Sequence, residues 1–149
     1  MGDSNEILPI EVLKRYKTIA VVGASKNPEK DANSVPAYLK EHGYRIIPIN
    51  PSAGEILGER AYANLLDLPP ELANEIEVVD VFRPSEELPQ IARQVVEMKD
   101  RKRTDSNRPL VFWAQLALEN DEAKRILVEN SIPYVMNACM RSEHRKSNL

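Results

Sequence analysis

Short apolar runs alternate with longer amphipathic stretches along this chain of 149 residues. Five runs are rich in β-branched residues and nearly continuous in apolar side chains: Thr18–Gly23, Tyr44–Asn50, Glu77–Arg83, Pro109–Gln115 and Ile132–Ala138. Runs of this kind are typical of parallel strands that are covered on both faces. The pattern therefore predicts a parallel sheet of five strands.

The stretches around these runs have helical spacing. We predict helices over Ile10–Tyr16, Ser34–Gly43, Ser85–Lys99 and Glu119–Asn130. Gly43 stands where a left-handed C-terminal cap is expected, and Asn120 is the expected N-cap of the last helix. Pro89 must lie in the first turn of its helix. One stripe of that helix is apolar, and it consists of Leu88, Ile91, Val95 and Met98.

Two stretches show neither the apolar runs of the predicted strands nor the spacing of a helix. Gly54–Leu72 predicts turns and one helical turn, with a stop at its two consecutive prolines, and Asp100–Pro109 predicts a solvated basic loop. That loop has no interleaved aromatic residues, so it does not favour nucleic acid. Strands that alternate with helices through right-handed crossovers predict an α/β fold. We expect a Rossmann-like, doubly wound five-stranded parallel sheet with strand order 3-2-1-4-5.

Composition narrows the class of protein. The length predicts a single domain, with its core over about residues 17–140, a short N-terminal helix and a charged C-terminal tail. No apolar run approaches the roughly 20 residues of a membrane span, and the N-terminus lacks the pattern of a secretory signal. A single cysteine fits a reducing compartment, and a net charge of −3 attracts neither nucleic acid nor anionic membrane. We therefore expect a cytoplasmic protein without either partner.

Polar and small residues gather where the predicted strands end. In an open α/β sheet the ligand lies past the carboxyl ends of the strands, where the strand order reverses. Four strand ends should share this rim, and they carry Gly23, Ala24, Ser25, Lys26, Asn50, Pro51, Phe82, Arg83 and Gln115.

The loop after the first strand has the parts of a phosphate site. Gly23 permits a tight turn, and the helix that follows directs free N–H groups and a partial positive charge toward it. Its small, cationic and hydrogen-bonding residues are Ala24, Ser25, Lys26, Lys30, Asn33 and Ser34. A di- or polyphosphate would suit this loop. A plain strand-to-helix turn is the alternative, and the loop alone does not decide between the two.

The usual nucleotide motifs are missing. A dinucleotide fingerprint has two more glycines and an acidic residue after the second strand, where this chain has Asn50-Pro51. Both differences count against a nicotinamide or flavin dinucleotide. The chain also lacks the glycine-rich motif of P-loop nucleotide hydrolases.

Four segments together resemble the small stand-alone CoA-binding proteins, relatives of the CoA-binding domain of the succinyl-CoA synthetase alpha subunit. They are VVGASKNPEKDANSVPAYLKEHGYRIIPINP, EILGERAY, DVFRPSEELP and FWAQLAL, and they run in order from about Thr18 to Cys139. The resemblance implies a Rossmann-like sheet with coenzyme A along the rim of strand ends.

The resemblance also implies roles for individual residues. Gly23, Ala24 and Ser25 would meet the phosphates, with Lys30, Asn33 and Ser34 beside them; Asn50-Pro51 would flank the adenosine, Phe82-Arg83 the nucleotide and pantetheine, and Gln115 the pantetheine end. The chain differs from the family pattern at Ala117, where a glycine is common. Because alanine restricts positive φ, we expect a narrower pantetheine end.

No catalytic set emerges from the residues. We interpret His42 as structural and His144 as part of a solvated tail, and two histidines with one cysteine make no metal site. Ser25 lacks the surroundings of a nucleophile elbow. Asp80 could act as an acid or base, but acceptance of backbone hydrogen bonds is the preferred interpretation. Cys139 is either a small buried residue or a redox contact that forms a mixed disulfide with CoA.

The sequence therefore predicts a protein that binds coenzyme A or acyl-CoA through a phosphate-cradling loop, as a non-catalytic carrier, sensor or accessory module. One alternative is a subunit of an acyl-CoA synthetase or transferase that needs a larger partner. A small NAD(P)-binding protein is the other alternative. A homodimer is compatible with the sequence, which does not determine the oligomeric state.

Overall fold

The computed structural model describes residues 5–101 and 109–149. Its elements, with 3-10 helices marked η, are α1 (Pro9–Arg15), β1 (Thr18–Val22), α2 (Asp31–Glu41), β2 (Arg45–Ile49), β3 (Glu55–Ile56), β4 (Glu59–Arg60), η1 (Leu65–Asp67), α3 (Pro70–Glu75), β5 (Val78–Val81), η2 (Ser85–Glu87), α4 (Leu88–Arg101), β6 (Val111–Ala114), α5 (Asp121–Glu129), β7 (Tyr134–Val135) and α6 (Met140–Ser147). The five predicted strands are confirmed as β1, β2, β5, β6 and β7. The predicted basic loop falls mainly on residues 102–108, outside the described residues.

Five strands form one parallel sheet in the order β2-β1-β5-β6-β7. The α/β fold class is confirmed, but counted along the chain the order is 2-1-3-4-5, so the predicted order 3-2-1-4-5 is wrong. Pro48 supplies the physical reason, because a proline cannot donate to a strand on its outer side and is confined to sheet edges. The outer edge of β2 pairs instead with Tyr62, whose N–H donates to Pro48 O (3.0 Å) and whose carbonyl accepts from Asn50 N (2.8 Å).

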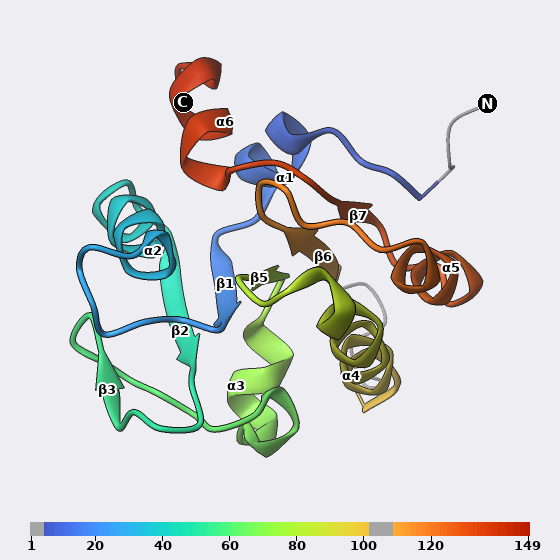
Figure 1. The fold of residues 1–149 in the computed structure, drawn as a ribbon, viewed down its shortest axis with the longest axis horizontal. Helices are drawn as coiled ribbons and strands as arrows, with labels where there is room; N and C mark the ends of the chain where they lie inside the picture. The colour runs from blue at the N-terminus through green and yellow to red at the C-terminus, as the bar shows by residue number, and fades with distance from the viewer. Residues whose placement is uncertain (1–4, 102–108) are drawn as a thin grey trace.

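Helices cover both faces of the sheet (Figure 1). Across the sheet, the step from β1 to β2 goes toward one edge, and the steps from β5 to β6 and from β6 to β7 go toward the other edge. Because the crossovers are right-handed, α2 lies on one face of the sheet, and α4 and α5 lie on the other. Helices α1 and α6 join α2 on its face, and α3 lies on the face of α4. Each face of the sheet has its own hydrophobic core, and neighbouring residues of β6 belong to different ones. Phe112 is buried on the face covered by α4 and α5, and Trp113 is buried on the face covered by α1, α2 and α6.

Most helix boundaries follow the predicted signals. Gly43 has φ +92° just after α2, and the Asn120 side chain caps α5 by accepting from Ala123 N at 2.9 Å. The predicted apolar stripe of α4 is buried. The helical turn predicted before the two prolines is η1, which ends at Asp67, but Pro70 then begins α3, which was not predicted. The missing N–H of a proline costs nothing at the first helical position, which explains the difference.

The predicted charged tail is wrong, because its residues form helix α6 against α1 and α2. Met140 and His144 are four residues apart and share the buried side of this helix. His144 is only 5% exposed, and its Nδ1 lies 2.8 Å from the hydroxyl of Tyr38. The ring of Tyr38 stacks on His42 with centroids 4.0 Å apart, so His42 makes a packing contact.

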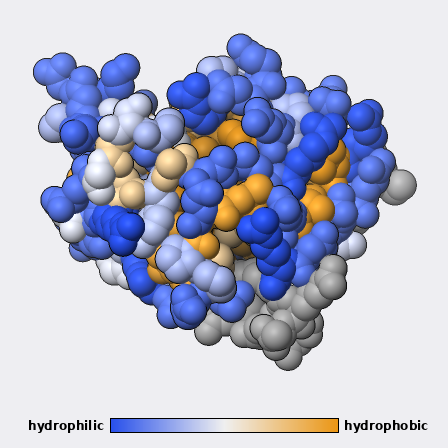
Figure 2. All heavy atoms as spheres, turned by 90° about the horizontal axis from the view of Figure 1, so that it is seen from below, coloured by the Kyte–Doolittle hydropathy of each residue, from blue (hydrophilic) through white to orange (hydrophobic). Residues whose placement is uncertain are grey.

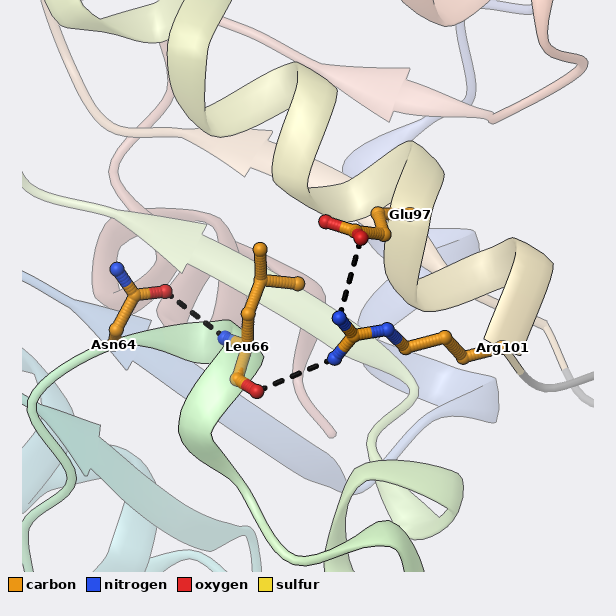
Figure 3. Close-up of polar contacts among 4 residues, drawn as sticks. All are labelled: Asn64, Leu66, Glu97 and Arg101. Carbon is orange, nitrogen blue, oxygen red and sulfur yellow. Dashed lines mark hydrogen bonds and ion pairs between the residues drawn. The ribbon is translucent and has the colours of Figure 1, made fainter.

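A short polar network holds η1 beside α4 (Figure 3). The Asn64 side chain caps η1 by accepting from Leu66 N at 2.9 Å. The carbonyl of Leu66 accepts from Arg101 at 3.3 Å, and Arg101 also bonds Glu97 at 3.2 Å. This attachment fixes the segment around Asn64, which forms one wall of a pocket described below.

On the face shown in Figure 2, the hydrophobic surface consists of several separate areas with hydrophilic side chains between them. Among the described residues, no helix has both the length and the apolar character to cross a membrane.

Candidate functional site

The ends of β1 and β5 lie side by side at the point where the strand order reverses. Gly23 follows β1 with φ +87°, and a Cβ at this position would lie 2.6 Å from Phe82 O and 2.9 Å from Cδ of Arg83. The glycine is therefore required twice, by its left-handed backbone and by the close approach of the next strand end. In a sheet of order 2-1-3-4-5 this crevice is where ligands bind.

Hydrogen bonds within the loop after β1 determine its shape. The Asn33 side chain donates to Ser25 O at 2.8 Å, and the Ser25 hydroxyl accepts from Asn27 N at 3.0 Å. Asn50 connects this loop to the end of β2, because its amide donates to Ala24 O at 2.8 Å. Asn33 and Ala24 are buried, so they organise the loop and have little surface for a ligand.

The N-terminus of α2 follows this loop and carries positive charge. Lys30 is the N-cap residue, and its side chain makes no capping hydrogen bond. Within residues 5–101 and 109–149, neither Lys26 nor Lys30 forms an ion pair. The nearby Asp31 is offset by Arg141, which lies 3.9 Å away and also donates to Ser34 Oγ at 3.3 Å. Together these groups suit an anion.

Two pockets flank the crevice, and Arg83 lines both. The first, here the Asn50 pocket, has a volume of about 570 Å³ and is bounded by Gly23, Asn50, Pro51, Asn64 and residues of α4. The second, here the Phe82 pocket, has a volume of about 480 Å³ and is bounded by Lys30, Val35, Phe82, Gln115, Leu116, Leu118 and Cys139, among others. Of the predicted site residues, Ala24, Ser25, Lys26, Asn33 and Ser34 line neither.

Arg83 is held at the boundary of the pockets by Glu87. Its Nε and Nη2 donate to the two carboxylate oxygens of Glu87 at 3.1 and 2.8 Å. This hydrogen bonding raises the pKa of Arg83 and lowers the pKa of Glu87. The guanidinium therefore stays charged, and its position is set by a partner from η2.

A buried chain of polar groups runs behind the Phe82 pocket. Gln115 donates to Asp80 Oδ1 and accepts from Met140 N at 3.2 Å, so its amide links β5, β6 and the start of α6. Asp80 is fully buried, and its Oδ2 has no hydrogen-bond partner in the part of the chain that the structure describes. Burial raises the pKa of Asp80 to about 7, although hydrogen bonds from Gln115 and the Val81 backbone lower it.

One feature of the Phe82 pocket was not predicted. Leu116 is 66% exposed although it is large and apolar, and the sequence offered no signal for it because its run reads as a strand end. Cys139 was predicted to be either a small buried residue or a redox contact near the rim, and the structure makes it the N-cap of α6, half-buried on the pocket wall. Arg141 was also missed, because its segment was interpreted as a tail.

These observations define a Rossmann-like α/β domain. Its candidate ligand rim lies between the ends of β1 and β5, from which the chain continues toward opposite edges of the sheet. A family model for the CoA binding domain matches residues 17–145. The chain therefore belongs to the CoA binding domain family, which confirms the resemblance noted in the sequence.

Three relatives show how far the similarity extends. The chain is 39% identical to the protein YneT of Bacillus subtilis over 134 residues, which is 90% of each protein. It is 36% identical to a solved structure of a hypothetical protein from Pyrococcus horikoshii, with a TM-score of 0.80 over 98% of this chain and 96% of that one. It is also 31% identical over 77 residues to ADP-forming acetate–CoA ligase II of Archaeoglobus fulgidus, but this match spans 11% of the ligase.

Proposed function

We propose that this protein binds coenzyme A or a CoA thioester at the rim between β1 and β5, and that it acts as a carrier, sensor or accessory module. The observation that carries the proposal is a cationic helix N-terminus beside the Gly23 turn, with a pocket on either side. Coenzyme A has the matching order of parts, because its pyrophosphate separates the adenosine from the pantetheine arm. Family membership supports the same ligand.

The residues that would hold the phosphates lie at the turn and the helix that follows it. The N–H groups of Gly23 and Ser25 already donate to Ile49 O and Ala32 O, so the N–H groups that remain for phosphate are those of Ala24 and of the first two residues of α2. Lys26 and Lys30 would add charge. Asn33 and Ser34 would act mainly by supporting this loop and Arg141, respectively.

The two pockets would take the two ends of the ligand. Asn50 and Pro51 would flank the adenosine in the Asn50 pocket, and Phe82 would face the pantetheine arm in the Phe82 pocket. Arg83 would contribute charge between them. Gln115 lines the Phe82 pocket, but its amide already bonds Asp80 and Met140, so we assign it a positioning role there.

Calorimetry with purified protein and CoA tests the proposal, with Ser25→Trp as the variant. The indole would fill the space above the loop, while the sheet and its core stay unchanged, as circular dichroism would verify. We expect loss of CoA binding in this variant. Full affinity in a folded Ser25→Trp protein would show that the phosphates bind elsewhere.

Competition with NAD separates this proposal from a dinucleotide-binding protein. Asn50 occupies the place where an acidic side chain commonly binds the ribose hydroxyls. We expect NAD to leave CoA binding unchanged. Binding of NAD without binding of CoA would overturn the proposal.

A second candidate function is that of a subunit in a CoA ligase. The similarity to the acetate–CoA ligase covers 50% of this chain, which supports a shared module without its catalytic partners. Co-purification from native extract tests this candidate. A larger nucleotide-binding protein that co-elutes and enables acyl-CoA formation would favour it, and a chain that elutes without one would favour the carrier.

Cys139 also lines the Phe82 pocket, where the thiol end of CoA would lie. Native mass spectrometry with and without reductant tests the predicted redox contact. A CoA adduct that disappears only with reductant, and is absent from Cys139→Ser, would support the contact. CoA release that is independent of reductant would exclude it.

A further inference from the structure

One part of the Phe82 pocket lies away from the phosphate loop and is largely apolar. Strands β6 and β7 are farther from β1 than β5 is, and the connections that follow them contribute Gln115, Leu116, Leu118 and Cys139 to the pocket. Among these described residues there is no charged side chain. The charged residues of the pocket belong to α2 and to the end of β5.

The backbone holds Leu116 outward on this part of the pocket. Ala117 has φ +69°, and its N–H donates to the side chain of Asn137 at 2.6 Å. Asn137 itself has φ +60°, and its N–H donates to Leu118 O at 3.1 Å. Two non-glycine residues in the left-handed region therefore brace one another across the β6–α5 and β7–α6 connections. Strained backbone that the surrounding structure maintains is common at ligand sites.

Gln115 precedes Leu116 in the sequence, and its side-chain amide is already hydrogen-bonded within the protein. Gln115 is 5% exposed, and its amide is used by Asp80 and by the N-terminus of α6. This end of the pocket therefore offers an exposed leucine and other apolar walls to whatever lies against it. Among the described residues that the β6–α5 and β7–α6 connections give to the pocket, none is a cation that could pair with a terminal carboxylate.

We propose that this end of the Phe82 pocket receives the acyl group of a CoA thioester, and that Leu116 selects a neutral, apolar acyl chain. The inference rests on the proposed binding of CoA at the neighbouring loop. Apolar carbon atoms of the acyl group would cover the exposed leucine, and a dicarboxylic acyl group would place its charge where no cation compensates it.

Calorimetry with three ligands tests this inference: CoA, hexanoyl-CoA and succinyl-CoA. We expect the wild-type protein to bind hexanoyl-CoA about tenfold more tightly than CoA, as burial of roughly two methylene groups would produce. Succinyl-CoA should bind no more tightly than CoA. In Leu116→Ser the preference for hexanoyl-CoA over CoA, taken as the ratio of the two affinities in the same variant, should fall below about threefold.

Leu8→Ser is the matched control, because Leu8 is also 66% exposed but is the N-cap of α1, away from the pocket. This variant should keep the full preference for hexanoyl-CoA. Leu116→Ala provides a second truncation should the serine variant prove unstable.

The outcomes separate the two proposals. Equal binding of CoA and hexanoyl-CoA, equal binding of succinyl-CoA and hexanoyl-CoA, or a preference that survives in Leu116→Ser would overturn the acyl inference while leaving CoA binding in place. Failure of all three ligands to bind the wild-type protein would overturn the proposed function together with the inference.

Discussion

Gly23 and Phe82 are in backbone contact, so close that a single added methyl group at Gly23 would lie 2.6 Å from the Phe82 carbonyl oxygen. This contact joins the ends of β1 and β5 at the centre of the proposed site. The contact explains why one glycine is enough in this loop. Gly23 has no Cβ, and this allows the end of the neighbouring strand β5 to approach it closely.

Gly23→Ala should therefore lower the free energy of unfolding by roughly 2–4 kcal/mol, from the left-handed backbone and the steric overlap together. Gly43→Ala is the matched control, because Gly43 has φ +92° but nothing within 4 Å of its added Cβ. It should cost only about 1 kcal/mol. Urea denaturation of both variants measures the difference, and equal losses would show that the contact with Phe82 is unimportant.

Lys30→Glu should weaken CoA binding at least about tenfold, because it places a negative charge at the proposed phosphate site. Lys14→Glu changes the net charge equally from the exposed side of α1 and should leave the affinity unchanged. The wild-type affinity should also fall as salt is added, since salt screens exposed charges. Similar losses in both variants would indicate a general effect of net charge.

Asp80→Asn should change how stability depends on pH. The pKa of Asp80 is raised by burial to about 7 from 3.8, so the folded protein holds its proton over a range where the unfolded chain releases it. Stability is then lost as the pH rises from about 4 to about 7. The variant, measured against wild type by urea denaturation, should gain relative stability across this range and keep the gain above it. A constant difference would contradict the raised pKa.

His144 should act in the opposite direction. Burial, with smaller effects of His42 and Lys17, lowers its pKa from the ordinary value of 6.5. The folded state thus favours the neutral ring, and its contribution to stability is present above pH 6.5 and lost as the pH falls below that value. His144→Gln should show a smaller loss of stability between pH 7.5 and 5 than wild type in thermal melts. His42→Gln should keep most of the loss, because burial is the larger cause.

Local patterns in the sequence were sufficient for most elements. The apolar runs located the five strands, Asn120 and Gly43 marked helix ends, and the stripe of α4 identified its buried face. Each of these depends on interactions among residues a few positions apart. The rim of strand ends could also be predicted, because parallel strands place their carboxyl ends on one side of the sheet.

The sequence by itself thus determined the alternation of parallel strands and helices, the glycine turn before α2 and the family. Only the tertiary structure decided that β5 lies beside β1, which brings Arg83 to Gly23 and divides the rim into two pockets. It also decided that His144 is buried and that Leu116 is exposed. These outcomes depend on which distant segments pair and cover one another, a choice that periodicity within a segment does not contain.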